Sequence, residues 1–342
     1  MTIGQVKEKI KTGEYGFLQE DMHLGDHIVL LSLGGSHAYG TETETSDLDI
    51  RGCALNRKRE ILIGEDFSQV TDEATDTTVY SFCKLIGLLS GCNPNTIEML
   101  GCKPEHYLYV SGAGRELLDN AHLFLSQKAV DSFGGYANQQ LRRLDNKSAR
   151  LVGQEEKEQH ILRTIRHAFH EWRERYFQMP EDGVRLYLDQ AVHEDREKEI
   201  FMDVTLRHYP LRDYKCLWGE MQEIVKSYDK LGKRNSNAIG HGKLGKHMMH
   251  LIRLYMMCLD ILEKEQIVTY REKEHDLLME IRGGKYLNQD RQPVPEFFEL
   301  VRGYEKRLEY AAANTSLPKE PDYQRIRDFT ASVNERVVRG DS

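Results

Sequence analysis

The sequence predicts an α/β protein: a small, mixed, twisted sheet with helices on one face at residues 1–125, followed by an α-helical domain at residues 126–342. The first part is predicted by an apolar, β-branched run at Ile28–Leu33 and by alternating acidic and apolar residues from Asp47 to Ile50. The second part is predicted by long charged segments with apolar residues at helical spacing. A chain of 342 residues is long enough for two such domains.

Short helices and strands are expected to alternate in the first part. Residues 2–11 are predicted as a short amphipathic helix, and the strand at 28–33 follows it. Residues 61–69 are expected to form a loop with short strand character. Residues 76–82 are rich in β-forming side chains, and residues 84–91 are predicted as a helix.

A further helix is expected to start at Asn93, because Asn is a good N-cap and Pro94 suits the first helical position. This structural role explains the segment as far as Glu98, and we favour it over a catalytic role for that carboxylate. The remaining chain is predicted to be helical at 126–151, 155–178, 184–200, 213–230, 245–264, 271–282, 294–312 and 322–338.

The overall charge limits the class of protein. Lys and Arg number 47 against 55 Asp and Glu, so the formal net charge is −8. This argues against a protein wrapped in nucleic acid over its whole surface, although a local basic patch fits. The sequence shows no apolar leader and no apolar run of about 18 residues, so we expect a cytoplasmic protein that does not enter a membrane.

Zinc binding is not favoured. The six cysteines form no C-x-x-C pair, which also speaks against a disulfide scaffold. Two histidine pairs, His167 with His170 and His247 with His250, have a spacing that could share an ion. Neither pair has an acidic or cysteine partner at a recognisable spacing.

The predicted strand at 28–33 stops at a Gly34-Gly35-Ser36 turn. Two glycines let backbone N–H groups approach a bound anion, and the serine hydroxyl adds another donor. Gly35 and Ser36 are therefore candidates for holding the phosphates of a nucleotide. No Lys followed by Ser or Thr stands at the spacing that a P-loop requires.

Asp47 and Asp49 are the first candidates for chemistry. Side chains alternate across a strand, so the two carboxylates are expected to share one face while Leu48 and Ile50 enter the opposite, apolar face. Neighbouring carboxylates repel unless a cation lies between them, and hard oxygen ligands suit Mg²⁺. A phosphate cradle facing a magnesium site is the apparatus of phosphoryl or nucleotidyl transfer.

The succession of an apolar strand, a Gly-Gly-Ser turn and an Asp-x-Asp pair resembles the nucleotide-binding motif of the DNA polymerase β superfamily of nucleotidyltransferases. The resemblance implies a polymerase-β-like palm. It also implies a third carboxylate, on a strand adjacent to the Asp-x-Asp strand, that binds a second metal ion and takes the acceptor proton. Asp76 heads the best strand in that region and is our choice, with Asp72 and Glu73 as alternatives. An acid that merely caps an edge strand is the structural alternative.

The segment at residues 226–254 is basic, with seven Lys or Arg and one Asp. On its predicted helix, Lys246, His250 and Arg253 stand at i, i+4 and i+7 and form one stripe. A basic stripe on an otherwise apolar helix is costly unless it faces an anion or solvent. We expect the triphosphate, or the phosphates of the acceptor, to be its partner, and a solvated face is the alternative.

Other segments resemble one branch of the superfamily, the YcgL-like group with the RNA-repair-associated RlaP family. They run through most of the chain in order, and the match is vague at residues 150–240. The matching residues are Gly35-Ser36, Asp47 to Gly52, Tyr80, Asn93-Pro94, Ile97 to Leu100, Lys246 to Leu254, Leu278 to Lys285, Ser316 to Pro318 and Pro321-Asp322.

This resemblance implies an enzyme that transfers a nucleoside monophosphate from a nucleoside triphosphate to an acceptor hydroxyl and releases pyrophosphate. The expected triphosphate is ATP, the expected cofactor is Mg²⁺ or Mn²⁺, and the expected acceptor is RNA, in RNA repair. The expected site residues are the catalytic and metal-binding Asp47, Asp49 and Asp76 and the nucleotide-binding Gly35, Ser36, Lys246, His250 and Arg253.

Three rival interpretations stay open. The first is AMP transfer to a protein side chain, as in small antitoxin-type nucleotidyltransferases. The second is synthesis of a small nucleotide product. The third is a binding module with a degenerate site, against which the intact Ser36, Asp47 and Asp49 argue. The sequence predicts no oligomeric state.

Overall fold

The chain folds into two compact units, each with an apolar core. The computed structural model describes residues 3–149, 161–162, 164–165, 168, 172, 176, 179–180, 183–192, 198–232, 243–289 and 292–341. The first unit combines Met1–Gln140 with Met248–Lys285 and Pro295–Ser342, and the second combines Leu141–His247 with Tyr286–Val294. Both ends of the chain therefore build the first unit, whereas we had expected one division at residue 125.

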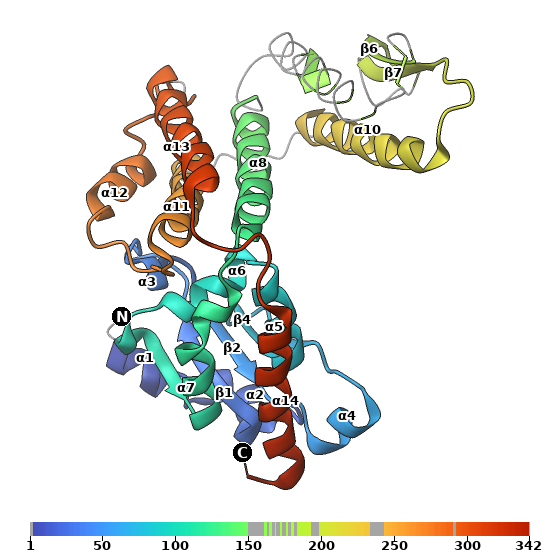
Figure 1. Ribbon diagram of the computed structural model, residues 1–342. Coiled ribbons are helices and arrows are strands. Elements are labelled where there is room, and N and C mark those ends of the chain that lie inside the picture. Colours follow the sequence, from blue (N-terminus) through green and yellow to red (C-terminus); the bar gives the residue numbers. More distant parts are fainter. Residues whose placement is uncertain are drawn as a thin grey trace. The chain divides into compact units, whose positions relative to one another are not determined.

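A five-stranded mixed sheet lies in the first unit, in the order β3-β4-β2-β1-β5. Figure 1 labels its strands β4, β2 and β1. The strands are β1 (Ile28–Leu33), β2 (Ile50–Ala54), β3 (Gln69–Asp72), β4 (Thr77–Ser81) and β5 (Tyr107–Val110). β2 pairs antiparallel with β1 and parallel with β4. The strand predicted at 28–33 has the predicted bounds, and all six of its residues are buried. A mixed α/β fold is thus confirmed.

Most of the predicted helices fall close to their predicted positions, whereas several short helices were not predicted, and residues 61–63, expected in a loop, end one of them. Those of the first unit are α1 (Ile3–Lys9), α2 (Phe17–Glu20), α3 (Gly35–Tyr39), α4 (Lys58–Ile63), α5 (Phe82–Ser90), α6 (Pro94–Ile97), α7 (Gly112–Asp119), α12 (His275–Gly283), α13 (Pro295–Asn314) and α14 (Tyr323–Arg339). Two more, α8 (Lys128–Ala149) and α11 (Lys243–Lys264), each contribute residues to both units. Asn93 caps α6 as predicted, because its side chain accepts a 3.0 Å hydrogen bond from the Asn95 N–H. No helix in the described ranges is long and apolar enough to cross a membrane.

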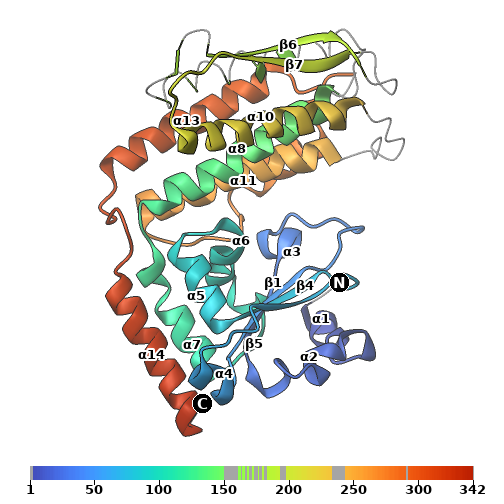
Figure 2. The same cartoon turned by 90° about the vertical axis from the view of Figure 1, so that its right-hand side faces the viewer.

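Apolar side chains cover both faces of the sheet. Alternation along β2 separates the faces: Cys53 joins a larger cluster with α5, α7 and α14, whereas Ile50 and Ala54 join a smaller one with Tyr15 and Leu18. Figure 2 shows α5 and α14 on one side of the sheet and α2 on the other. The expectation of helices on one face only was wrong, because the N-terminal segment supplies apolar residues to the second face.

The second unit contains a hairpin of β6 (Val184–Gln190) and β7 (Lys198–Val204), together with α10 (Leu211–Gly232). The helix predicted at 184–200 was wrong. Val184 and Leu186 alternate with polar residues and lie buried in a core shared with α10, which is the pattern of a half-buried strand. Most of the helix predicted at 155–178, including His167 and His170, lies outside the described residues.

Candidate active site

The Gly-Gly-Ser turn and the Asp-x-Asp pair meet at the end of β1. The Gly34 N–H donates to the Asp49 carbonyl at 2.8 Å. Gly35 has φ +52°, and a Cβ atom on it would lie 1.6 Å from Asp49 Oδ2. Only glycine fits here, because a side chain would strain the backbone and collide with the carboxylate. Ser36 follows in the first turn of α3 and is 8% exposed.

Asp47 and Asp49 precede β2 instead of lying within it, since the strand begins at Ile50. The prediction that both aspartates lie within a strand was therefore wrong, because the strand begins one residue after Asp49. The predicted apolar face is confirmed: Ile50 is fully buried and Leu48 packs against the same cluster. Asp47 is exposed and Asp49 is half-buried.

Asp76 lies at the same end of the sheet as Asp49. β4 runs parallel to β2, with Thr77 opposite Ile50, so the residues before these two strands are neighbours. The Ile50 N–H donates to the Asp76 carbonyl at 3.3 Å. Asp76 directly precedes β4, which is the strand adjacent to β2. Its backbone has φ +44°, a conformation that costs energy for a residue other than glycine.

The two alternatives to Asp76 have different surroundings. Asp72 accepts hydrogen bonds from the Thr75 N–H at 3.0 Å and from the Thr75 hydroxyl at 2.8 Å, so it stabilises the turn between β3 and β4. Glu73 faces the same cleft as Asp76. The contacts therefore favour Asp76 and Glu73 over Asp72 as groups that can meet a ligand.

A cleft of about 1060 Å³ in the first unit is lined by Asp47, Glu73 and Asp76, whereas Asp49, Gly35 and Ser36 are not among its lining residues. It is strongly acidic, with six lining carboxylates: Glu14, Glu42, Glu44, Asp47, Glu73 and Asp76. The Lys9 ammonium also lines it and lies 3.2 Å from Glu14. Carboxylates that line one cleft repel one another and disfavour an anion there unless cations are present.

The donor set suits a hard divalent cation, since carboxylate oxygens are the ligands that Mg²⁺ prefers. Across the described ranges, no three His, Cys, Asp or Glu side chains are already grouped as a metal site. The Arg51 guanidinium lies beside Asp76, with 3.2 Å between Nη2 and Oδ1, and the Asp49 carboxylate rests against Gly35. Carboxylate oxygens at this end of the sheet have the chemistry that a magnesium ion requires, so the metal site stays a prediction, in which an ion would compete with Arg51 for Asp76.

Comparison with known proteins assigns the family. The family described as "RlaP: RNA repair pathway DNA polymerase beta family" matches residues 16–331. The chain belongs to the RlaP family. A protein of Enterobacteria phage T4, described as "Uncharacterized 38.9 kDa protein in nrdC-mobD intergenic region", is 24% identical over 336 residues, covering 89% of this chain and 96% of the phage protein. No solved structure matches the chain.

Membership of the RlaP family confirms the resemblance found in the sequence and links the chain to polymerase-β-like nucleotidyltransferases and RNA repair.

The three residues of the basic stripe in this RlaP chain differ in exposure and in their neighbours. Arg253 is only 8% exposed, and its guanidinium carbon lies 3.3 Å from the centre of the Tyr39 ring. His250 Nδ1 lies 2.8 Å from Arg253 Nη2. Lys246 is exposed and falls in the second unit, so a phosphate partner for it stays a prediction.

A buried acid that the sequence did not indicate lies within the electrostatic reach of Arg253. The Tyr39 hydroxyl donates to the Glu98 carboxylate, and Glu98 is 9% exposed. Burial raises the pKa of Glu98, and the Arg253 charge and the Tyr39 hydrogen bond oppose that rise. Tyr39 belongs to α3, which carries Ser36, so this cluster ties the phosphate turn to α11. The one feature of the sequence that could have indicated this cluster is the presence of an acid, Glu98, within the apolar run from Ile97 to Leu100.

Arg253→Ala is expected to lower the free energy of unfolding by about 1–3 kcal/mol, because it removes the buried contact with the Tyr39 ring and a positive charge that offsets the burial of Glu98. Urea denaturation at two ionic strengths measures this, and we expect equal losses because a buried pair is poorly screened by salt. Lys246→Ala on the same helix is the control, and its stability should stay within about 0.5 kcal/mol of the wild type. If Arg253→Ala is as stable as the wild type, then this cluster contributes nothing to the free energy of unfolding.

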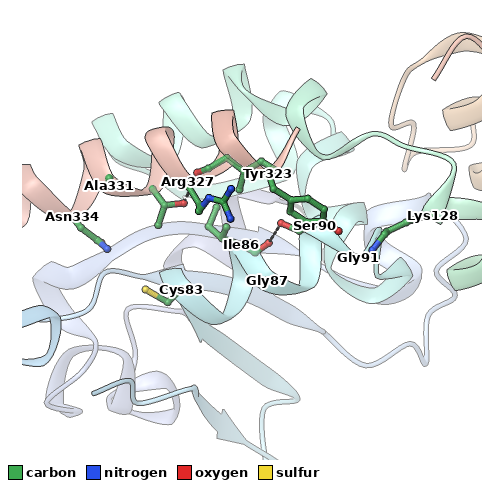
Figure 3. A pocket seen from close by; sticks show the side chains of 12 residues that line it. Cys83, Ile86, Gly87, Ser90, Gly91, Lys128, Tyr323, Arg327, Ala331 and Asn334 are labelled. Carbon is green, nitrogen blue, oxygen red and sulfur yellow. Dashed lines mark hydrogen bonds between the residues drawn. The ribbon is translucent and has the colours of Figure 1, made fainter. Parts of the chain in front are cut away.

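A second pocket, of about 660 Å³, lies between α5 and α14 in the first unit (Figure 3). Ile86 and Ile326 line it, together with the basic Lys128 and Arg327. Lys128 lies 3.7 Å from the exposed Glu320 carboxylate, and Arg327 Nη2 donates to Gln324 Oε1 at 3.3 Å. Of the predicted site residues, Asp47 and Asp76 line the acidic cleft and not this second pocket, so the acidic cleft is the candidate site.

Proposed function

We propose that this RlaP chain is a metal-dependent nucleotidyltransferase that transfers a nucleoside monophosphate, from ATP, to a hydroxyl group of RNA. The observation that carries the proposal is the contact between Gly35 and the Asp49 carboxylate, beside Asp76, at one end of the sheet. A phosphate turn and acidic groups that touch each other suit a triphosphate bound through a metal ion. Membership of the RlaP family supports the same reaction class and the link to RNA repair.

In this proposal the acidic residues have two tasks, which are to bind the metal ion and to accept a proton. Asp47, Asp49 and Asp76 hold Mg²⁺ or Mn²⁺, which when bound neutralises charge on the triphosphate. Gly35 and Ser36 orient the β- and γ-phosphates through an N–H and a hydroxyl donor. Asp76 accepts the proton of the attacking hydroxyl. A bond forms between that oxygen and the α-phosphorus, the bond from the α-phosphorus to the bridging oxygen breaks, and pyrophosphate leaves.

The acidic lining of the cleft favours a second candidate function, which is AMP transfer to a protein side chain. Six carboxylates disfavour a polyanionic acceptor within the cleft itself, whereas a protein side chain brings no such charge. The RNA proposal therefore requires the strand to approach with its terminal hydroxyl first and its phosphates outside the cleft. The fraction that carries label after incubation with α-labelled ATP separates the two candidates.

Ser36→Ala is expected to weaken ATP binding by about tenfold or more, because a hydrogen bond to a charged phosphate contributes roughly 1.5–3 kcal/mol. Isothermal titration calorimetry with ATP and Mg²⁺ measures the change. Ser90→Ala is a matched control, since the Ser90 hydroxyl donates to the Ile86 carbonyl at 2.7 Å in the second pocket. If Ser36→Ala binds ATP as tightly as the wild type, then the Gly-Gly-Ser turn has a structural role and does not bind the nucleotide.

A further inference from the structure

The loop between α3 and Asp47 forms part of the wall of the acidic cleft. Glu42, Thr43, Glu44 and Ser46 line the cleft from this loop, and the segment contains no helix or strand. Within the loop, the Thr43 N–H donates to the Ser46 hydroxyl at 2.8 Å, and the Ser46 N–H donates to the Thr43 carbonyl at 2.9 Å. These local bonds close a turn, but they do not fix the turn against the rest of the first unit.

Arg282, in the last turn of α12, supplies that connection. Its Nη1 donates to the Thr41 carbonyl, and its Nη2 lies 3.3 Å from both the Thr43 and the Ser46 hydroxyl oxygens. One planar guanidinium thus reaches three points along six residues of loop. Burial lowers the pKa of Arg282 and the nearby Glu42 carboxylate opposes that shift, so the charge is partly buried and faces an acid.

The helix that carries Arg282 also reaches the cleft. Met279, one turn earlier on α12, lines the cleft beside the loop. Before α12, the Tyr270 ring packs so closely on Gly40 that a Cβ atom there would lie 2.5 Å from the ring, and the Arg271 N–H donates to the Tyr39 carbonyl at 3.1 Å. The segment from Tyr270 to Arg282 therefore holds both the end of α3 and the loop that follows it.

We propose that Arg282 is a positioning residue that fixes the loop at residues 41–46 and thereby sets the place of Asp47 in the cleft. The proposal rests on the function proposed above, in which Asp47 holds the metal ion. A fork of donors in one plane suits this task, because it can engage a carbonyl and two hydroxyls together. Lysine offers a single ammonium on a flexible stem and cannot span all three acceptors.

Hydrogen exchange tests the loop directly, on the whole protein without metal or nucleotide. Arg282→Ala is expected to speed exchange of the amides in the peptide that covers residues 41–47 by about tenfold, because the loop loses its anchoring bonds. Arg282→Lys should give an intermediate rate. Arg302→Ala is the control, since Arg302 pairs with Glu299 on the exposed side of α13. Wild-type exchange in Arg282→Ala, or equal acceleration in Arg302→Ala, would overturn the proposal.

A second measurement asks whether the loop places Asp47. We expect the Mg²⁺ concentration that gives half-maximal binding of a non-hydrolysable ATP analogue to rise about tenfold in Arg282→Ala and less in Arg282→Lys. Partial unfolding would lower the amplitude of binding but leave this midpoint unchanged. An unchanged midpoint despite a loosened loop would refute the positioning role. If wild-type binding is independent of Mg²⁺, the proposed function fails, and the exchange rates still decide whether Arg282 holds the loop.

Discussion

Asp47→Asn and Asp49→Asn are each expected to lower nucleotidyl transfer by about a hundredfold or more, because each removes a charge that holds the metal ion at the reacting phosphate. The fold should survive the Asp47 change. Asp47 is exposed in a cleft with six carboxylates, and removing one of them relieves repulsion in the absence of metal. The melting temperature of Asp47→Asn without Mg²⁺ should therefore equal or slightly exceed that of the wild type.

Glu44→Gln is the matched control for this pair of variants. Glu44 is an exposed carboxylate that lines the same cleft outside the Asp-x-Asp pair, so its replacement removes the same charge without removing a proposed ligand. We expect it to retain most of the activity. Transfer by Asp47→Asn or Asp49→Asn at a tenth of the wild-type rate or above would contradict the metal assignment.

Gly35→Ala should impair both transfer and stability. The added methyl carbon would lie 1.6 Å from Asp49 Oδ2, and alanine in the left-handed region costs about 1–2 kcal/mol before that collision is relieved. Either the turn or the Asp49 carboxylate must move, and each is part of the proposed site. We expect transfer to fall about a hundredfold, measured under saturating ATP, together with a lower melting temperature.

Gly87→Ala is the control for the glycine variant. Gly87 lies in α5, and a Cβ atom there would meet nothing within 4 Å. Alanine should therefore stabilise this helix by about 0.5–1 kcal/mol and leave transfer unchanged. Full activity of Gly35→Ala would mean that the contact between the turn and Asp49 has no part in the reaction.

The part of the site that is contiguous in sequence could be predicted from sequence. β1 matched its prediction because six consecutive apolar-rich residues are buried and a Gly-Gly turn ends them. The resemblance implied a third carboxylate on a strand adjacent to the Asp-x-Asp segment, and the parallel pairing of β2 with β4 places Asp76 next to Ile50. The hairpin of β6 and β7 was missed because charged residues within it suggested a solvated helix, although Val184 and Leu186 alternate as a strand requires.

The supporting residues could not be predicted, because they meet across long stretches of chain. Tyr39, Glu98 and Arg253 come from three separate segments, and no local periodicity relates their positions. Arg282 likewise reaches a loop some 240 residues earlier in the chain. Helical spacing placed Arg253 on a basic stripe, but burial against Tyr39 depends on tertiary packing that spacing does not report.

In the proposed function, the acidic cleft transfers a nucleoside monophosphate to RNA. The most direct test incubates the purified protein with α-labelled ATP, Mg²⁺ and total RNA, then separates RNA, protein and small products. We expect label in RNA with the wild type and with Glu44→Gln, and none with Asp47→Asn or Asp49→Asn. Label in protein alone would support the second candidate, AMP transfer to a side chain. Absence of label from every fraction, or labelling of RNA that persists in both aspartate variants, would contradict the claim.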